Sequence, residues 1–403
     1  MGDILFLAHR IPYPPDRGDK IRSFNILKFL AERATVHLAA FVDEACDRGR
    51  EDDLAPFTAD RAIIWRGISK PVAALKALAS GRPASLTAFD SAVMHLAVAK
   101  IFEQRSIDCV YIFSSQMAQY VPADCRARII MDFCDMDSAK FATYAESARG
   151  PLRWMMRREG RLLLAHEAQV AARADASLFV SAAEAALFTA AAGAGCVHVV
   201  ENGIDTALFD PRAAFERPAT EHPLVVFTGQ MDYPPNVDAV SWFANDVMPL
   251  VRCRHSDARF AVVGRNPSET VRALAALPGV LVTGEVSDVR GWLAAADVVV
   301  APLRIARGIQ NKVLEAMAMA RPVVASGAAA EGIDHRGTLL VADGAEAMAA
   351  AVGSLLDDYQ RAQALGNSAR AQVIERYGWA ARLAVLDALM GLTAPVDKSR
   401  SAA

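Results

Sequence analysis

Residues 298–320 read VVVAPLRIARGIQNKVLEAMAMA, which is an apolar run, a loop with one glycine and a segment with helical spacing. The run Val298–Ala301 has the length and the uniform apolarity of a strand that is buried on both faces of a parallel sheet. A helix is expected to begin near Asn311. A strand joined to a helix in this way is the repeating unit of a doubly wound α/β sheet.

The same alternation of apolar strands and helical segments continues along the whole chain. The apolar runs predict strands at residues 4–8, 36–41, 110–113, 129–131, 177–180, 197–200, 224–227, 260–263, 280–282, 298–301 and 322–325. A polar, proline-bearing stretch near residues 205–222 interrupts the pattern once, as a linker does. We therefore predict two Rossmann-like domains, residues 1–208 and 209–378, that face each other across a cleft.

Length and composition bound the class of protein. The 403 residues suit two domains, and a hydrophobic content of 53% exceeds the usual ~45–50% and excludes a disordered chain. A formal net charge of −3 argues against a nucleic-acid-binding protein, whose phosphate-contacting surface is strongly basic. The six cysteines form no C-x-x-C pair, which fits a reducing cytoplasm better than a zinc site or a disulfide framework. We find neither a signal peptide nor a run of ~18 uncharged apolar residues, and therefore expect a cytoplasmic protein that meets a membrane only from its surface.

The loop and helix start within residues 302–320 predict an anion-binding site. Gly308 gives the loop backbone freedom, and the free N–H groups of a first helical turn attract anions together with the helix dipole. Lys312 adds a cation in that turn, and Glu315 lies three residues on, along the same helical face. A carboxylate beside a phosphate site is suited to binding ribose hydroxyls. An ordinary amphipathic helix with a solvated Lys312–Glu315 pair accounts for these residues equally well.

The helix also resembles part of a known donor-binding signature. Glu315-Ala316-Met317 is similar to the second half of the Glu-x7-Glu motif of family-4 retaining glycosyltransferases, which have the GT-B fold. Glu315 then corresponds to the ribose-binding Glu of that family. Arg307 stands where the family has its first Glu, and it would place a second cation near the diphosphate. Further similar stretches are Ser181 with Glu184, residues 202–205, residues 227–229 and residues 262–264.

Three longer stretches resemble the sugar transferases associated with bacterial exosortase and exopolysaccharide loci. They are HRIPYPPDRGDKIRS at 9–23, MDFCDMDSAKFATYA at 131–145, and MDYPPN at 231–236 together with residues 307–320. The resemblance implies retaining transfer of a sugar from a nucleotide-diphosphate sugar to a saccharide or polyprenyl-linked acceptor, in exopolysaccharide or cell-surface glycan synthesis. It implies no metal and no cofactor besides that co-substrate. It also implies a last helix at 379–392 that returns to the first domain, before a flexible tail at 393–403.

The donor site expected from this resemblance depends on two cations. Relatives often bind phosphate through an Arg and a Lys after the first strand of the donor domain, but the chain has QMDYPPN at 230–236. Arg265 and Lys312 are the expected replacements, and they would stabilise the leaving diphosphate electrostatically. The full expected donor set is Gly229, Gly264, Arg265, Arg307, Gly308, Asn311, Lys312 and Glu315.

The loop after the first strand is the first candidate for acceptor binding. It follows the carboxyl end of a strand, where ligands of such sheets bind, and it carries Arg17, Gly18 and Lys20. Its cations suit phosphate oxygens. A surface loop stiffened by three prolines is the alternative.

Three aspartates after another strand form the second candidate. Asp132 or Asp135 is expected to orient the acceptor hydroxyl, with Asp135 as the candidate catalytic carboxylate. No histidine lies beside them, which disfavours a metal site. Alternatively, Asp137 or Ser138 caps the next helix. Ser114, in a stretch where many relatives have a histidine, is expected to line the site.

Arginines recur at every fourth position in one predicted helix. They are Arg149, Arg153, Arg157 and Arg161. Trp154, Met155 and Met156 lie between them, so the helix would suit an anionic membrane surface or a lipid diphosphate. A solvated face above a core-facing stripe is the common alternative. Trp65 and residues 70–82 are a second candidate for acceptor contact.

Two other functions are compatible with the same features. A nucleotide-sugar 2-epimerase has the same two-domain plan but needs acid and base carboxylates at the sugar ring and no acceptor. A non-catalytic protein that binds a nucleotide sugar would account for Arg307 at the position of the first Glu.

Overall fold

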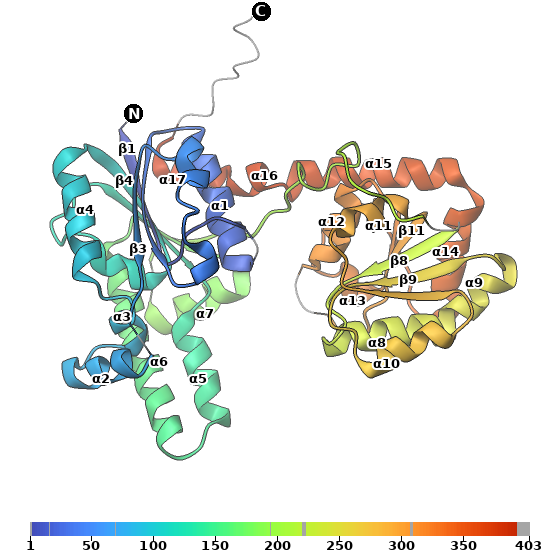
Figure 1. Cartoon of the computed structure of the whole chain (residues 1–403), viewed down its shortest axis with the longest axis horizontal. Helices are drawn as coiled ribbons and strands as arrows, with labels where there is room; N and C mark the ends of the chain where they lie inside the picture. The colour runs from blue at the N-terminus through green and yellow to red at the C-terminus, as the bar shows by residue number, and fades with distance from the viewer. Residues whose placement is uncertain are drawn as a thin grey trace, which may run out of the picture. The chain divides into compact units, whose positions relative to one another are not determined.

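A computed structural model describes residues 2–15, 17–68, 70–193, 195–219, 223–306 and 309–392 of the chain. The chain divides into two compact units. One comprises Met1–Asn202 with the segment from Arg382 onward, and the other comprises Gly203–Ala381. Each contains one parallel sheet with helices on both faces, which confirms the predicted α/β class (Figure 1). The first change of unit occurs a few residues before the boundary expected at 208/209.

The N-terminal unit contains a seven-stranded sheet in the order β3-β2-β1-β4-β5-β6-β7. The strands are β1 (Asp3–Ala8), β2 (Val36–Val42), β3 (Asp60–Trp65), β4 (Ile107–Phe113), β5 (Arg128–Cys134), β6 (Ala176–Phe179) and β7 (Val197–Val199). Strand β2 is buried at every position because helices cover both faces of the sheet, and such strands read as continuous apolar runs. The edge strand β3 is only partly buried and carries Asp60 and Arg61. The sequence analysis predicted neither β3, whose apolar run is limited to residues 62–65, nor the two-residue strand β13.

Helices surround this sheet. They are α1 (Gly18–Ala31), α2 (Lys70–Ser80), α3 (Ala84–Thr87), α4 (Ala92–Gln104), α5 (Asp137–Ser147), α6 (Gly150–Arg173), α7 (Ala182–Ala192) and α17 (Val385–Met390). Helices α5 and α6 pair as a hairpin that extends beyond the sheet (Figure 1). The late helix α17 packs on the same unit, where Arg33 Nε lies 2.6 Å from Asp387 Oδ1 and Arg128 Nη1 donates to the carbonyl of Leu389.

The second unit contains a six-stranded sheet in the order β10-β9-β8-β11-β12-β13. The strands are β8 (Leu224–Thr228), β9 (Arg259–Val263), β10 (Val280–Gly284), β11 (Val298–Ala301), β12 (Val323–Ala325) and β13 (Leu340–Val341). The helices are α8 (Pro234–Trp242), α9 (Met248–Arg254), α10 (Glu269–Ala273), α11 (Val289–Ala295), α12 (Asn311–Ala318), α13 (Gly327–Ala330), α14 (Ala345–Asp357), α15 (Tyr359–Arg376) and, at the change of unit, α16 (Trp379–Leu383).

The order of strands in this second sheet creates a place for a ligand. The chain first adds β9 and β10 on one side of β8, and then adds β11, β12 and β13 on the other side. The loops that leave β8 and β11 therefore diverge, and a crevice forms at the carboxyl ends of these strands. None of the helices in the described part of the chain is both long enough and apolar enough to span a bilayer.

Candidate active site

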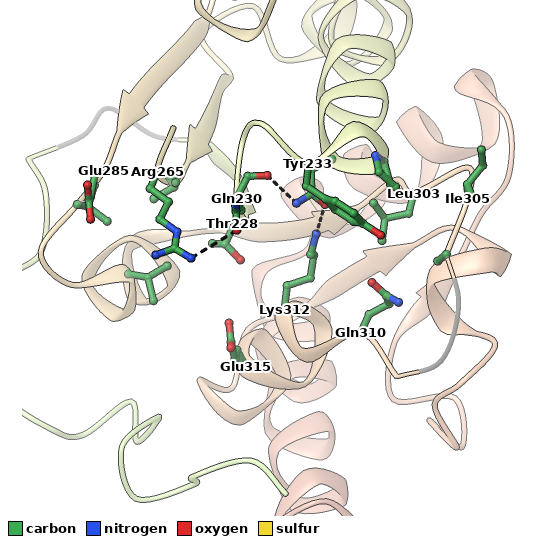
Figure 2. A pocket seen from close by; sticks show the side chains of 18 residues that line it. Thr228, Gln230, Tyr233, Arg265, Glu285, Leu303, Ile305, Gln310, Lys312 and Glu315 are labelled. Carbon is green, nitrogen blue, oxygen red and sulfur yellow. Dashed lines mark hydrogen bonds between the residues drawn. The ribbon is translucent and has the colours of Figure 1, made fainter. Parts of the chain in front are cut away.

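A cavity of about 820 Å³ lies at this crevice of the second unit (Figure 2). Its walls come from the loops after β8, β9, β10 and β11 and from the first turns of α8 and α12. The lining residues are Thr228, Gly229, Gln230, Tyr233, Pro235, Asn236, Val263, Gly264, Arg265, Glu285, Val286, Val289, Leu303, Ile305, Ala306, Gln310, Lys312 and Glu315.

Two glycines allow the loops after β8 and β9 to meet at the base of the cavity. A Cβ atom on Gly264 would lie 1.6 Å from the carbonyl oxygen of Gly229, so no side chain fits there. A Cβ on Gly229 would lie 2.8 Å from Asn236 Nδ2 and 3.3 Å from Lys312 Nζ. Close backbone approach is one of the main uses of glycine at such sites. The structure thus places both expected glycines at the cavity.

Of the two cationic side chains that line the cavity among the described residues, Lys312 is the less exposed. Its ammonium donates a hydrogen bond of 2.5 Å to Asn236 Oδ1 and lies 4.5 Å from the centroid of the Phe227 ring. Burial lowers the pKa of Lys312 to about 8, and the nearby Glu315 carboxylate opposes that shift. Burial also raises the pKa of Glu315 above its ordinary value. Within the described part of the chain Lys312 forms no ion pair, so its charge is partly buried without a directly bonded counterion.

Asn236 and Gln230 hold this arrangement in place, and the sequence did not identify either one. Asn236 is 5% exposed and donates from Nδ2 to the carbonyl of Gln230 at 2.9 Å, which aims its Oδ1 at Lys312. Arg265 is exposed and makes one long hydrogen bond of 3.4 Å to Gln230 Oε1 (Figure 2). Both polar side chains lie in the QMDYPPN stretch, which appeared only to lack the basic pair of the relatives.

The remaining expected donor residues lie at the start of α12. The helix begins at Asn311 as predicted, but the Asn311 side chain is exposed and does not line the cavity. Gln310 precedes the helix and lines the cavity instead. Arg307 and Gly308 lie outside the described residues. The structure therefore brings together five of the expected residues: Gly229, Gly264, Arg265, Lys312 and Glu315.

The basic residues expected to bind the acceptor form ion pairs within the N-terminal unit. Lys20 and Asp47 are each 1% exposed, and Lys20 Nζ lies 2.7 Å from Asp47 Oδ1. Arg17 is partly exposed and lies 2.8 Å from Glu44. Gly18 is the first residue of α1. In this conformation, Lys20 is thus directed into the fold and away from solvent.

Asp132 is also directed into the fold. It is fully buried and accepts hydrogen bonds from two nitrogens of Arg22 at 3.0 and 3.2 Å, from the Tyr111 hydroxyl at 2.8 Å and from the Cys134 amide at 3.1 Å. Arg22 in turn donates to the carbonyl of Val200. These bonds join α1, β4 and β5 at the carboxyl edge of the sheet, and they occupy both oxygens of Asp132.

Asp135 and Ser114 lie nearer the surface of the same edge. Asp135 is exposed and lies 3.0 Å from Lys140 Nζ. Ser114 is buried, has a φ of 77° and shares a hydrogen bond with Gln116.

The prediction that Asp137 or Ser138 caps α5 is wrong, because the N-cap residue is Met136. The Glu184 carboxylate instead accepts from the Met136 amide at 2.7 Å.

Part of the chain matches a family model. Residues 222–358 match the model described as glycosyl transferases group 1. A curated relative, the GDP-mannose-dependent alpha-(1-6)-phosphatidylinositol monomannoside mannosyltransferase of Mycobacterium tuberculosis, is 33% identical over 237 residues, which are 52% of this chain and 60% of the relative. The phosphatidyl-myo-inositol mannosyltransferase of Propionibacterium freudenreichii is 31% identical over 159 residues, which are 39% of this chain and 40% of the relative. The chain thus matches less than two thirds of the length of each relative.

Solved structures resemble the chain over nearly its whole length. The complex of Anabaena HepE with UDP and glucose has a TM-score of 0.58 at 16% identity, and the match covers 97% of this chain and all of that one. The sucrose-phosphate synthase of Thermosynechococcus elongatus has a TM-score of 0.61 at 18% identity, with 96% and 98% covered. The chain therefore has the GT-B fold of these glycosyltransferases, and residues 222–358 within it match the glycosyl transferases group 1 family.

Proposed function

We propose that the protein transfers a sugar from a nucleotide-diphosphate sugar to an acceptor hydroxyl. The observation that carries this proposal is Lys312, a partly buried cation that forms no ion pair within the described residues and lines a cavity of about 820 Å³. A diphosphate would supply the missing negative charge, and the cavity has the size of a small-molecule site. The match of residues 222–358 to glycosyl transferases group 1 supports the same function.

The proposed chemistry is the stabilisation of a leaving group. The bond between the anomeric carbon and the diphosphate oxygen breaks, and the acceptor oxygen bonds to that carbon. The acceptor proton passes to the departing phosphate. Lys312 and Arg265 would stabilise the charge that develops on the diphosphate, and the first turn of α12 would contribute its dipole. Glu315 would accept hydrogen bonds from the ribose hydroxyls.

Retention at the anomeric carbon is part of the proposal and follows from the family resemblance of residues 315–317. Substitution on one face of the sugar would let the diphosphate itself take the acceptor proton. No protein base is then needed. Replacement of Asp135, which is already paired with Lys140, would therefore lower turnover only slightly.

The acceptor is proposed to be a saccharide or a polyprenyl-linked saccharide of exopolysaccharide or cell-surface glycan synthesis. The two curated relatives are named for transfer to phosphatidylinositol acceptors, which supports a lipid-linked acceptor. Their names and that of the HepE complex leave GDP and UDP as the nucleotides to test. The proposed site of action is the cytoplasmic face of the cell membrane.

Calorimetric titration of the full chain with UDP, GDP, UDP-glucose and GDP-mannose tests the donor site. Wild type is expected to bind one nucleotide series, and Lys312→Ala to bind it about 10- to 100-fold more weakly, because a charge-assisted phosphate contact is lost. Lys100→Ala, at an exposed lysine of α4, is the matched control and should bind as wild type does. Equal affinity of Lys312→Ala and wild type would contradict the proposed role.

Product analysis completes the test. With a donor and a panel of glycan and polyprenyl-linked acceptors, a new glycoside should form, and its anomeric proton coupling should report retention. Conversion of the donor to an epimer in the absence of any acceptor would contradict the transferase proposal.

A further inference from the structure

The N-terminal unit exposes large apolar side chains on two neighbouring helices. On α2 they are Val72, Leu75 and Leu78, at 47, 70 and 52% exposure, and on α6 they are Leu152, Trp154 and Met155, at 50, 59 and 43%. Isolated exposed apolar residues are ordinary, but a contiguous patch marks an interaction site. The contacts between the two helices therefore decide whether these residues form one contiguous patch.

Helices α2 and α6 form one surface. Arg158 of α6 donates from Nη2 to the carbonyl of Ala77 on α2 at 2.9 Å. Glu159 of α6 accepts from the amides of Ala84 and Ser85, which begin α3 directly after α2. The two helices also enclose a hollow of about 130 Å³ whose walls include Ala74, Leu78, Phe141, Trp154 and Met155. Three of the exposed apolar residues, Leu78 of α2 and Trp154 and Met155 of α6, thus border a shared apolar hollow.

The charged residues on the same segments are almost all positive. Residues 66–82 and 148–161 contain nine Lys and Arg but only one acidic residue, whereas the rest of the chain contains 34 Lys and Arg against 45 Asp and Glu. That one acidic residue, Glu159, is 6% exposed because it caps α3. The four arginines that recur at every fourth position are all exposed: Arg149, which precedes α6, and Arg153, Arg157 and Arg161 within it. Cations concentrate here although the chain as a whole is negative.

The surface lies at the ligand-binding edge of its own sheet. Helix α2 follows the carboxyl end of β3, and the α5–α6 hairpin follows the carboxyl end of β5. Figure 1 shows α2 and the outer half of α6 at the same end of the N-terminal unit. Ligands of doubly wound sheets bind at this edge.

We infer that α2 and the first half of α6 dock the N-terminal unit onto a bilayer that contains anionic phospholipid. Trp154, Met155 and Leu75 enter the boundary between headgroups and acyl chains, and the arginines of α6 pair with lipid phosphates. Apolar and cationic groups side by side fit a bilayer, which offers both an apolar layer and phosphates. A purely acidic macromolecule would satisfy only the arginines. The inference concerns this surface and does not depend on the donor cavity.

Vesicle flotation with the full chain tests the inference. Vesicles of phosphatidylcholine with phosphatidylglycerol are expected to carry the protein upward at low salt. Vesicles of phosphatidylcholine alone, or raised salt, should carry much less, because attraction to anionic lipid is screened. Absence of binding to anionic vesicles at low salt would overturn the inference.

Two double variants separate the apolar and cationic contributions. Trp154→Ser with Met155→Ser removes apolar contact, and Arg153→Glu with Arg157→Glu reverses charge. Each pair should weaken vesicle binding by about 10-fold or more. The matched controls are Leu281→Ser with Tyr359→Ser, and Arg272→Glu with Arg361→Glu, all at exposed positions of the other unit. The controls should bind vesicles as wild type does, and equal losses in controls and test variants would contradict the proposal.

Two further measurements keep the result specific. Thermal unfolding must show that the variants are folded, and nucleotide affinity should be unchanged in them, because the donor cavity lies in the other unit. The failure of vesicle binding and the failure of the donor site can thus be told apart. If a soluble polyanion such as heparin binds as tightly as vesicles do, and the apolar variant binds both like wild type, the surface is a polyanion site and the bilayer proposal is wrong.

Discussion

The surroundings of Lys312 set its pKa. Its ammonium lies against Asn236 and the Phe227 ring, and its partial burial lowers its pKa to about 8. Below that pH the lysine is charged and would attract a diphosphate, and above it the free cavity loses the charge of Lys312 and keeps that of Arg265. A bound diphosphate favours the charged form and raises the pKa of the lysine again.

We therefore expect nucleoside diphosphate affinity to fall as pH rises above about 8, and binding there to take up a proton. Calorimetry in two buffers of different ionisation enthalpy measures that proton. Lys312→Arg keeps its charge at high pH, so it should bind without proton uptake. The same proton uptake in Lys312→Arg would assign it to another group.

Gly264 sets the shape of the same cavity by its lack of a side chain. Gly264→Ala would place a Cβ atom 1.6 Å from the Gly229 carbonyl oxygen, so the loop after β8 must move. We expect a loss of about 2–3 kcal/mol in the free energy of unfolding, measured by urea denaturation, and weaker nucleotide binding. Gly195→Ala is the control, because its Cβ would meet nothing within 4 Å. Equal stability of the two variants would contradict the steric argument.

At the scale of helices, carboxylates from α6 and α7 replace missing caps. Neither α3 nor α5 has a side-chain cap of its own, so their first amides need partners from elsewhere. Glu159 accepts from the start of α3, Glu184 from the Met136 amide, and Glu167 from the amide and hydroxyl of Ser138. These carboxylates thereby join α6 to α3 and to α5, and α7 to the residue before α5.

Glu167 makes this hairpin sensitive to pH. Burial raises the pKa of Glu167 to about 7, against an ordinary value of 4.5. Folding therefore favours the protonated carboxyl, and the stability it contributes is complete below about pH 4.5 and is lost as pH rises through about 7.

Glu167→Gln should remove this dependence, because the amide has no charge to bury. The difference in unfolding free energy between the variant and wild type should shift by up to about 3 kcal/mol in favour of the variant as pH rises from 5 to 8. Urea unfolding at the two pH values measures the gain, and Glu146→Gln, at an exposed position of α5, is the control. A difference between variant and wild type that does not change with pH would refute the assignment.

At the scale of the whole molecule, the sequence predicts the fold better than it predicts the site. Buried parallel strands such as β2 read as apolar runs, so the α/β class and the positions of most strands follow from the sequence pattern. The partly buried β3 and the two-residue strand β13 were missed. At the cavity, Gly229 and Gly264 followed from the family resemblance, and Lys312 followed from its position in the first turn of the helix after β11. Asn236 could not be found from the sequence, since its role depends on contact with a lysine distant in sequence.

The basic segment at residues 17–22, most of which lies in α1, shows that a sequence can also suggest a ligand site where the fold forms none. A sequence displays Lys20 and Arg22 as a cationic segment but hides their partners, Asp47 and Asp132, which only the fold brings near. Buried charges need such partners, so isolated cations in a sequence are poor guides to ligand sites unless burial is known.

Helix α17 allows a prediction at this scale. Leu386 is completely buried, whereas its neighbour Val385 is 37% exposed. Leu386→Ala should cost the N-terminal unit about 2–4 kcal/mol, because it leaves a cavity beneath the helix. Hydrogen exchange should locate the faster opening in β5, which α17 contacts, and leave the Gly203–Ala381 unit unchanged. Val385→Ala is the control, and equal exchange in both variants would contradict the packing role.

The two changes of unit, after Asn202 and after Ala381, make the Gly203–Ala381 unit an insertion within the other one. This has a consequence for synthesis on the ribosome. The inserted unit is one continuous stretch and can acquire its structure as soon as it has emerged. The unit that began first must wait for residues 385–390 before its sheet is fully covered. The unit that is translated first is therefore completed last, and β5 lacks the cover of α17 until residues 385–390 have emerged.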